Sequence, residues 1–233
     1  MLKKIIVTGG EGRFARELKK FKSNYKFFFR KKNQLNILSS RSIDSNLKKF
    51  KPDAILHLAG LSRPMSLHDK NINLSIDLNV IGTANLVKAC NKKKIKIIFL
   101  STSYLYPGRK GNYKEEDPLL PWNNYGWSKL GAESTVQMYK NSLIIRASMT
   151  EKPFIHKYAF ENVKCNFIFH DEFIKIFLKI IKLKGVINIG GKSQSIYQFA
   201  RKYNKKVKKK NSKGELPKNM DMSLRKINSL IKK

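Results

Sequence analysis

The feature that most constrains the fold is a regular alternation of short apolar runs with segments of helix length. Runs rich in Ile, Val, Leu and Phe predict strands at residues 3–9, 25–30, 53–60, 95–103, 141–148 and 185–191. Between them lie predicted helices at residues 12–21, 41–50, 73–94, 125–140 and 171–184. Continuous apolar strands that alternate with helices are typical of a parallel sheet covered on both faces. The sequence therefore predicts an α/β fold with a doubly wound parallel sheet.

The composition suits a folded chain in a reducing compartment. Of the 233 residues, 41% are hydrophobic, which is enough for a sizeable core. Cys90 and Cys165 are too few for a disulfide framework and lack the spacing of a metal site, so we expect buried core residues and no metal. No run approaches the ~20 apolar residues of a membrane span, and we expect no secretory leader. We expect a cytoplasmic protein that does not enter a membrane.

The net charge of +33 would attract nucleic acid or phosphorylated small molecules. Nearly all of the basic residues are lysine, and Ile and Asn are also abundant, which indicates a coding bias spread over solvated faces. Residues 201–214 form the one localised basic segment, either a phosphate-binding stripe or an exposed helix end. We expect residues 201–216, which are low in apolar side chains, to be a mobile loop.

A glycine-rich turn follows the first predicted strand. The run Thr8-Gly9-Gly10-Glu11-Gly12-Arg13-Phe14-Ala15 opens the first predicted helix. Glycines let the backbone approach a pyrophosphate closely, and a helix N-terminus supplies free N–H groups. A plain β–α turn is the alternative, but the position between the first buried strand and a helix favours dinucleotide binding.

The end of the second predicted strand indicates which dinucleotide binds. An acidic residue usually holds a ribose 2′-hydroxyl there, whereas a 2′-phosphate needs cations. This chain offers Arg30, Lys31 and Lys32, and we expect no carboxylate nearby. Because lysine is abundant everywhere, Arg30 carries most of the information. NADP is favoured, and NAD is the alternative.

Tyr125 and Lys129 stand four residues apart in the stretch WNNYGWSKLGAE. On a helix such residues share one face. A free tyrosine, with a pKa near ~10, is a poor acid–base group at neutral pH, and a neighbouring ammonium lowers that pKa by favouring the phenolate. An exposed i,i+4 pair is the alternative interpretation when the two residues are taken alone.

Four motifs together resemble the extended short-chain dehydrogenase/reductases. TGGEGRFA (8–15), HLAG (57–60), STSYLYPG (101–108) and YGWSKLGAE (125–133) are similar to segments of the dTDP-4-dehydrorhamnose reductase and NAD-dependent epimerase/dehydratase families. The match runs to about residue 148 and resumes more faintly at 185–200 and 217–227. The resemblance implies a Rossmann-type dinucleotide-binding domain at 1–148. A reduced substrate lobe follows at 149–233, with a late strand that returns to the sheet and a basic loop.

The resemblance also implies the site residues. Tyr125 would donate a proton to a carbonyl oxygen, Lys129 would hydrogen-bond the nicotinamide ribose, and Thr102 would polarise the carbonyl. Ser103 is the fallback for Thr102, and Asn79 would support a proton relay. The residues expected to contact the cofactor are Gly9, Gly12, Arg13, Phe14, Arg30, Leu58, Ala59, Gly60, Tyr125 and Lys129. His68 and the remaining histidines would be surface or packing residues.

Departures from the family narrow the reaction. The dehydratases carry an Asp-Glu pair directly after the catalytic Thr, where this chain has Ser103 and Tyr104, so dehydration is not expected. The resemblance implies NADP-dependent reduction of a nucleotide-linked 4-keto sugar, in nucleotide-sugar or surface-polysaccharide biosynthesis. An epimerase, a catalytically inactive regulatory subunit and a nucleic-acid-binding protein remain open, and nucleic acid is the least favoured. A homodimer through the helices at 73–94 and 125–140 also remains open.

Overall fold

The computed structural model describes residues 2–232, which form two compact units. The first unit comprises the chain up to Ser101 together with Asn123–Ile145 and Ile181–Val186. The second unit comprises Thr102–Trp122, Arg146–Ile180 and the chain from Ile187 onward. The predicted division of the chain into domains at residue 148 stays a prediction.

The first unit is built on a six-stranded sheet in the order β10-β5-β4-β3-β1-β2. The neighbouring pairs among β1 to β5 are parallel. Because β2 and β3 lie on opposite sides of β1, the winding direction reverses at β1, as in a doubly wound sheet. The predicted α/β architecture is thereby confirmed. The strands are β1 (Lys4–Thr8), β2 (Lys26–Arg30), β3 (Ala54–His57), β4 (Lys96–Leu100), β5 (Ser142–Ala147) and β10 (Gly185–Ile189).

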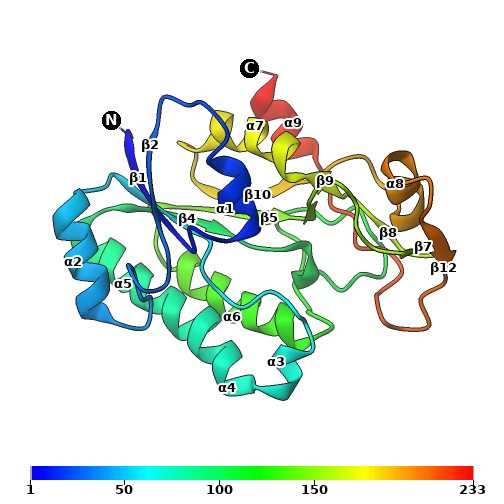
Figure 1. Cartoon of the computed structure of the whole chain (residues 1–233), viewed down its shortest axis with the longest axis horizontal. Helices are drawn as coiled ribbons and strands as arrows, with labels where there is room; N and C mark the ends of the chain where they lie inside the picture. Colours follow the sequence, from blue (N-terminus) through cyan, green and yellow to red (C-terminus); the bar gives the residue numbers. More distant parts are fainter. Residues whose placement is uncertain (1, 233) are drawn as a thin grey trace. The chain divides into compact units, whose positions relative to one another are not determined.

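Helices cover both faces of this sheet. Helices α2, α5 and α6 lie on one face, and α1 lies on the other (Figure 1). The predicted helix at 73–94 consists of three consecutive pieces: a short α turn, a π-helical segment, and a regular helix. The helical elements of the first unit are α1 (Arg13–Leu18), α2 (Ser40–Phe50), α3 (Leu67–Lys70), α4 (Ile72–Ser75), η1 (Ile76–Ile81), α5 (Gly82–Lys93) and α6 (Asn124–Gln137).

The apolar runs form strands because both faces of the sheet are covered. Burial is complete along the middle strands, so that Ile6, Ile55, Ile97 and Ile144 are at most 1% exposed. Leu86 and Val136 bring α5 and α6 onto the same cluster. A strand buried on both faces reads as a continuous apolar run, which is the pattern that the sequence showed.

The second unit has shorter and less regular elements. Three two-stranded pairs, β11-β8, β12-β7 and β6-β9, surround an apolar cluster that includes Val163, Phe169 and Phe199. Its elements are η2 (Ser103–Leu105), β6 (Met149–Thr150), β7 (Tyr158–Phe160), β8 (Lys164–Cys165), β9 (Ile168–Phe169), α7 (His170–Ile180), β11 (Gln194–Ser195), α8 (Ile196–Tyr203), β12 (Lys208–Lys210) and α9 (Arg225–Ile231).

The expectation of a mobile loop over residues 201–216 is wrong in part. Helix α8 continues to Tyr203, and Lys208–Lys210 form β12, which pairs in parallel with β7. All three lysines of β12 are exposed. The strand therefore depends on backbone hydrogen bonds, such as Lys208 N to Lys157 O at 2.9 Å, and has no apolar signal in the sequence.

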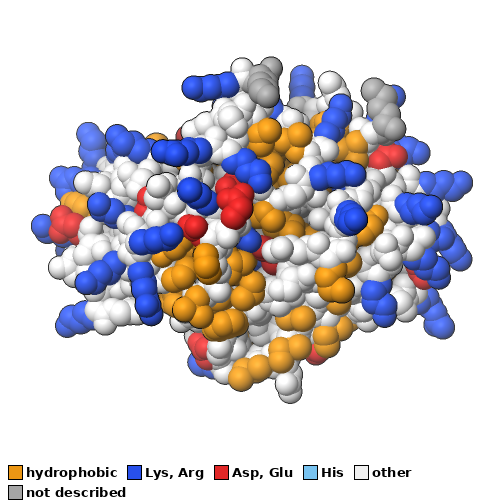
Figure 2. All heavy atoms as spheres, turned by 180° about the vertical axis from the view of Figure 1, so that it is seen from behind, with side chains coloured by type: hydrophobic (Ala, Val, Ile, Leu, Met, Phe, Trp, Pro, Cys, Tyr) orange, Lys and Arg blue, Asp and Glu red, His pale blue; other side chains and the backbone are white. Residues whose placement is uncertain are grey.

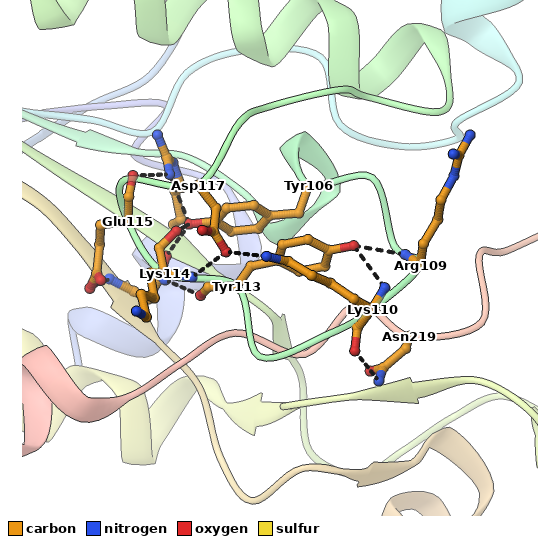
Figure 3. A network of polar contacts seen from close by, with 10 residues as sticks. Tyr106, Arg109, Lys110, Tyr113, Lys114, Glu115, Asp117 and Asn219 are labelled. Atoms are coloured by element: carbon orange, nitrogen blue, oxygen red, sulfur yellow. Dashed lines mark hydrogen bonds and ion pairs between the residues drawn. The ribbon is translucent and has the colours of Figure 1, made fainter.

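A polar network fixes the segment that follows β4 within the second unit. The stacked rings of Tyr106 and Tyr113 lie 4.9 Å apart, with polar partners around them (Figure 3). The Tyr106 hydroxyl accepts from Arg146 Nη1 at 2.8 Å and can donate to Asn188 Oδ1 at 2.9 Å. Asn188 in turn donates through Nδ2 to Tyr113 O and through its backbone N to Glu115 Oε1. Burial raises the pKa of Tyr106 to about 12, so this hydroxyl is neutral at physiological pH.

Both cysteines are buried, as predicted, and burial raises the pKa of the Cys90 thiol to about 12. Within residues 2–232, no helix has the length and hydropathy needed to cross a membrane. The same part of the chain holds no group of three or more His, Cys, Asp or Glu side chains suited to a metal ion.

Candidate functional site

The predicted motifs of the first unit meet at one edge of its sheet. In the strand register, Arg30 pairs with Thr8, Thr8 pairs with His57, and His57 pairs with Phe99. These residues stand at or next to the carboxyl ends of β2, β1, β3 and β4. In open α/β sheets, ligands bind outside this edge at the point where the winding reverses. The glycine turn, HLAG and the end of β4 therefore border one region.

The glycine turn is closely packed against the HLAG segment. Gly9 has φ of +64°, and a Cβ there would lie 2.8 Å from Ala59 N. Gly10 N donates to Arg30 O, and Gly12 N donates to Gly9 O. Arg13 is partly exposed at the start of α1, whereas the Phe14 side chain is only 7% exposed and packs inward. Only glycine fits the Gly9 position without a shift of neighbouring backbone.

A buried hydrogen-bond chain fixes the HLAG segment beside the turn. Thr83 Oγ1 donates to Asn79 O, so it accepts from His57 Nε2 at 2.9 Å. His57 Nδ1 then accepts from Thr8 Oγ1 at 2.9 Å, and Thr8 Oγ1 accepts from Leu58 N and Ala59 N. Burial, together with the charge of Lys129, lowers the pKa of His57 to about 3, so the imidazole is neutral. This histidine orders the backbone and is unsuited to acid–base catalysis.

Asn79 connects the HLAG segment to the helix that carries Tyr125. Its Oδ1 accepts from Leu61 N at 2.7 Å, and its Nδ2 donates to Leu61 O and to Ser128 Oγ. Ser128 Oγ donates to Tyr125 O. A Cβ on Gly60 would lie 2.7 Å from Asn79 Oδ1, so glycine is required for this approach. Asn79 thus acts as a structural bridge, and its predicted part in a proton relay stays a prediction.

Helix α6 begins where the sequence has a capping residue. The side chain of Asn123 accepts from Gly126 N at 2.8 Å, which places Tyr125 in the first turn of the helix. Lys129, one turn later, donates to Leu100 O at 2.8 Å, and its Nζ lies 3.9 Å from the centre of the Phe99 ring. Burial lowers the pKa of Lys129 to about 7, against the opposing effect of Glu133. Lys129 is thus directed at the carboxyl end of β4, and the catalytic role predicted for the Tyr125–Lys129 pair stays a prediction.

Glu133 is the last residue of the motif at 125–133, but no role was predicted for it. It is 0% exposed, and its Oε2 accepts from Ser101 Oγ at 2.6 Å. Its signal was present in the sequence, because it stands four residues after Lys129 and therefore shares the same helix face.

His68 is buried, as a packing residue would be, but it packs against Tyr125. The two ring centres are 5.2 Å apart in an edge-to-face arrangement. His68 Nδ1 is paired with Ser75 Oγ at 2.7 Å, while its Nε2 has no hydrogen-bond partner among the described residues. Burial lowers the pKa of His68, so a neutral ring faces the phenol at physiological pH. No short motif contains both residues, so nothing in the local sequence indicates this contact.

Arg30 lies at the end of β2, beside the glycine turn. Its Nε donates to Asn46 Oδ1 at 3.1 Å, and its guanidinium lies over the ring of Phe50. A carboxylate is nonetheless close to this corner, since Glu11 Oε1 lies 3.9 Å from Lys31 Nζ. The expectation that no carboxylate lies near Arg30, Lys31 and Lys32 is therefore wrong for Lys31, which has Glu11 of the glycine turn close to it.

Thr102 and Ser103 belong to the second unit. Thr102 Oγ1 accepts from Tyr104 N at 3.3 Å, and Ser103 Oγ accepts from Ser148 Oγ at 2.7 Å. Because Ser103 is engaged within that unit, Thr102 is the better candidate of the two. The predicted catalytic role of Thr102 stays a prediction.

Basic side chains are scattered over much of the face shown in Figure 2, except for its lower middle, where apolar side chains gather, and no single basic stripe stands out there. This distribution agrees with the interpretation of the charge as a general feature of the solvated surface.

Comparison with protein families gives one clear result. The family described as the RmlD substrate binding domain matches residues 3–151, which is more than half of the chain.

Two kinds of curated relative are similar over the same part. Methionine adenosyltransferase 2 subunit beta from Pongo abelii is 29% identical over 143 residues, covering 58% of this chain and 42% of the relative. A dTDP-4-dehydrorhamnose reductase from Aggregatibacter actinomycetemcomitans is 28% identical over 152 residues, covering 63% of this chain and 51% of the relative. The matches thus span about half the length of these relatives, or less.

Solved structures match nearly the whole chain. A dTDP-4-dehydrorhamnose reductase from Bacillus anthracis in complex with NADP has a TM-score of 0.87 at 19% identity, covering 98% of this chain and 92% of that one. The UDP-Glc/GlcNAc 4-epimerase from Campylobacter jejuni has a TM-score of 0.76 at 19% identity, with the same coverages. At this identity the structural similarity establishes the fold alone.

Proposed function

Because the chain belongs to the RmlD substrate binding domain family, we propose that it is an NADP-dependent reductase of a nucleotide-linked 4-keto sugar. The observation that carries this proposal lies in the first unit. Gly9 packs closely against Ala59, and the next residue, Gly60, packs against Asn79. Asn79 donates to Ser128 Oγ, which donates to the backbone oxygen of Tyr125. A glycine turn suited to a pyrophosphate and the first turn of the helix that carries Tyr125 are therefore linked within the first unit, which supports a site shared by the two.

The residues present fit a nicotinamide dinucleotide. Gly9, Gly10 and Gly12 have no side chains in the turn after β1, and the side chain of Glu11 between them is exposed, so that a phosphate can approach the glycine backbone. When bound, the cofactor supplies a hydride, and the protein supplies orientation and a proton. Lys129 would hydrogen-bond the cofactor ribose, as the family resemblance implies.

Tyr125 would donate its phenolic proton to the carbonyl oxygen of the substrate. Lys129 favours the phenolate that remains, because its ammonium lies on the same helix face. For Thr102, the family resemblance alone implies that its hydroxyl would stabilise the charge that develops on the carbonyl oxygen.

The preference for NADP rests on Arg30. Its guanidinium is held by Asn46 and Phe50 at the end of β2, where the family resemblance places the 2′-phosphate. An arginine held in this way is well suited to a phosphate because its donors are already oriented. The Bacillus anthracis reductase was solved with NADP, which agrees with this assignment.

The test is direct. The purified chain is mixed with NADPH and dTDP-4-dehydrorhamnose, and NADPH consumption is followed by absorbance. We expect turnover that falls by a factor of at least ~100 in Tyr125→Phe, while NADPH binding is retained. Reduction that is unchanged in this variant would remove Tyr125 from the mechanism. Interconversion of UDP-sugars without net consumption of cofactor would favour an epimerase.

A second candidate function is a subunit that binds a dinucleotide without catalysis. It is favoured by curated relatives that are named as beta subunits of methionine adenosyltransferase 2. This candidate predicts NADPH binding without reduction of any keto sugar. It also predicts that the chain alters the kcat or KM of a methionine adenosyltransferase from the same source. Turnover of a keto-sugar nucleotide would exclude it.

A further inference from the structure

The proposed reaction leaves one buried acidic side chain without a role. Glu133 is 0% exposed, on the helix that carries Tyr125 and Lys129. Two of its contacts, with Ser101 Oγ at 2.6 Å and Gln137 Nε2 at 3.0 Å, come from groups that donate, so both carboxyl oxygens act as acceptors. A carboxylate is costly to bury unless a cation compensates it, so a buried acidic side chain here calls for an explanation.

Glu133 and Lys129 hold the same strand end from one helix face. Lys129 donates to the backbone oxygen of Leu100, and Glu133 accepts from the side chain of Ser101, the next residue. The two side chains are four residues apart, and their contacts at the end of β4 are adjacent. The two side chains are therefore anchored to the same short stretch of backbone.

The charges around Lys129 single out Glu133. Burial lowers the pKa of Lys129, and the charge of Glu133 opposes this effect by raising it. From β3, His57 is neutral and offers no counter-charge. From β4, Phe99 presents a ring face and Leu100 a carbonyl, and on α6 itself Tyr125 lies one turn before Lys129. A pKa of about 7 means that small changes in this balance alter the fraction of charged Lys129 at neutral pH.

We propose that Glu133 is a positioning residue whose carboxylate keeps Lys129 cationic and aligned for the cofactor. The role of Lys129 toward the cofactor rests on the proposed function. The electrostatic coupling of Glu133 to Lys129 does not, and it can be measured with no ligand present.

The decisive experiment measures the protonation of Lys129 in the intact chain. The partly exposed side chain is labelled with acetic anhydride over a range of pH, and the extent at Lys129 is read by mass spectrometry of its peptide. The pH at which labelling of Lys129 is half-maximal is the midpoint. In Glu133→Gln this midpoint should fall by about one pH unit, since an opposite charge nearby shifts a pKa by about this much. Ser101→Ala is the matched control, because it removes the hydrogen bond and leaves the carboxylate. Its midpoint should stay at or above that of the unmodified chain.

A second variant guards against failure of Glu133→Gln to fold. Gln137 is exposed and contacts Glu133, so Gln137→Lys places a cation beside the carboxylate with little packing change. It should also lower the Lys129 midpoint. An unchanged midpoint in folded Glu133→Gln, or in Gln137→Lys, would overturn the proposal and leave Glu133 as a purely structural tie to Ser101.

NADPH affinity as a function of pH links this coupling to function. Binding that needs charged Lys129 weakens as the pH rises through its midpoint, and in Glu133→Gln this loss should begin about one unit lower. Absence of NADPH binding in every form would contradict the proposed function. The labelling result would still decide the role of Glu133.

Discussion

The two compact units bury polar side chains in different ways. In the first unit, strands and long helices form an apolar interior, and three of its most buried polar groups, His57, Asn79 and Glu133, lie near the carboxyl edge of the sheet, while Lys96 is buried at the opposite edge. In the second unit, the interior itself is partly polar, with Arg146 at 2% and Asn188 at 0% exposure around the fully buried ring of Tyr106. In the first unit the folded state is therefore stabilised mainly by apolar packing. In the second unit, hydrogen bonds between buried polar groups also hold the interior together.

This difference predicts how each unit responds to substitutions in its interior. A continuous apolar core loses stability in proportion to the volume removed. A network such as that of Tyr106 fails differently, because each lost partner leaves another buried group unsatisfied. The irregular segments of the second unit are thus specified by a few hydrogen bonds between residues far apart in sequence.

The largest effect is expected at Tyr106. Tyr106→Ala should reduce the free energy of unfolding by about 4 kcal/mol, because it removes a buried ring together with its hydroxyl. Tyr106→Phe keeps the ring and should still cost roughly 2 kcal/mol, since it leaves Arg146 and Asn188 without one partner. Urea denaturation followed by circular dichroism measures both. The control in the first unit is Ile98→Val, for which about 1 kcal/mol is expected. If Tyr106→Phe costs less than Ile98→Val, the contrast between the two interiors fails.

The next effect concerns Lys129 of the first unit, whose burial near the candidate site reduces the free energy of unfolding. The pKa of Lys129 is about 7 in the folded chain and near its ordinary 10.5 when unfolded. Between these values the unfolded chain binds one more proton, so this lysine makes the free energy of unfolding rise with pH. Lys129→Met lacks this contribution. Between about pH 6 and pH 9, the free energy of unfolding of the unmodified chain should rise by roughly 2–3 kcal/mol more than that of Lys129→Met.

Urea denaturation of both proteins at several pH values checks this, and the other titrating groups cancel in the difference. Lys26→Met is the control, because Lys26 is an exposed lysine at the start of β2. A difference that does not change with pH would show that Lys129 is solvated like a surface lysine.

The same contrast explains which features could be predicted from the sequence. The sheet of the first unit and its helices follow from periodicity, because buried strands such as residues 54–57 must be apolar throughout. The glycine turn and the Tyr125–Lys129 face follow from local spacing. Strand β12 could not be foreseen, since it consists of three exposed lysines and has no apolar residue.

Contacts between distant segments were also beyond local patterns. His68 meets Tyr125 across 57 positions of sequence, and Asn188 meets Tyr106 across 82. Neither pair has a periodicity or a motif that indicates it. Glu133 is different, because its spacing from Lys129 was visible, while its burial, which makes the charge matter, was not.

A smaller change in the free energy of unfolding is expected at Gly9, where the glycine turn after β1 packs closely against Ala59. Gly9→Ala should reduce the free energy of unfolding by about 2 kcal/mol, because its Cβ meets the backbone of Ala59 and its φ is positive. NADPH binding should weaken as well. Gly185→Ala is the matched control in the same unit, since it has φ of +86° but nothing within 4 Å of its Cβ. Equal losses in the two variants would mean that the close approach of Gly9 to Ala59 adds no cost beyond the backbone conformation.

The smallest effect should appear at Arg30, and it separates binding from stability within the first unit. Arg30 is partly exposed and rests on Phe50, so Arg30→Ala should change the free energy of unfolding little. The affinity for NADPH should fall about tenfold, which corresponds to ~1.4 kcal/mol, because a charge-assisted contact to the 2′-phosphate is lost. NADH lacks that phosphate, and its affinity should stay the same. Titration calorimetry with both cofactors measures this, with the exposed Arg41→Ala as control. Equal weakening for NADPH and NADH would place Arg30 away from the 2′-position and leave the choice of cofactor to other residues of this edge.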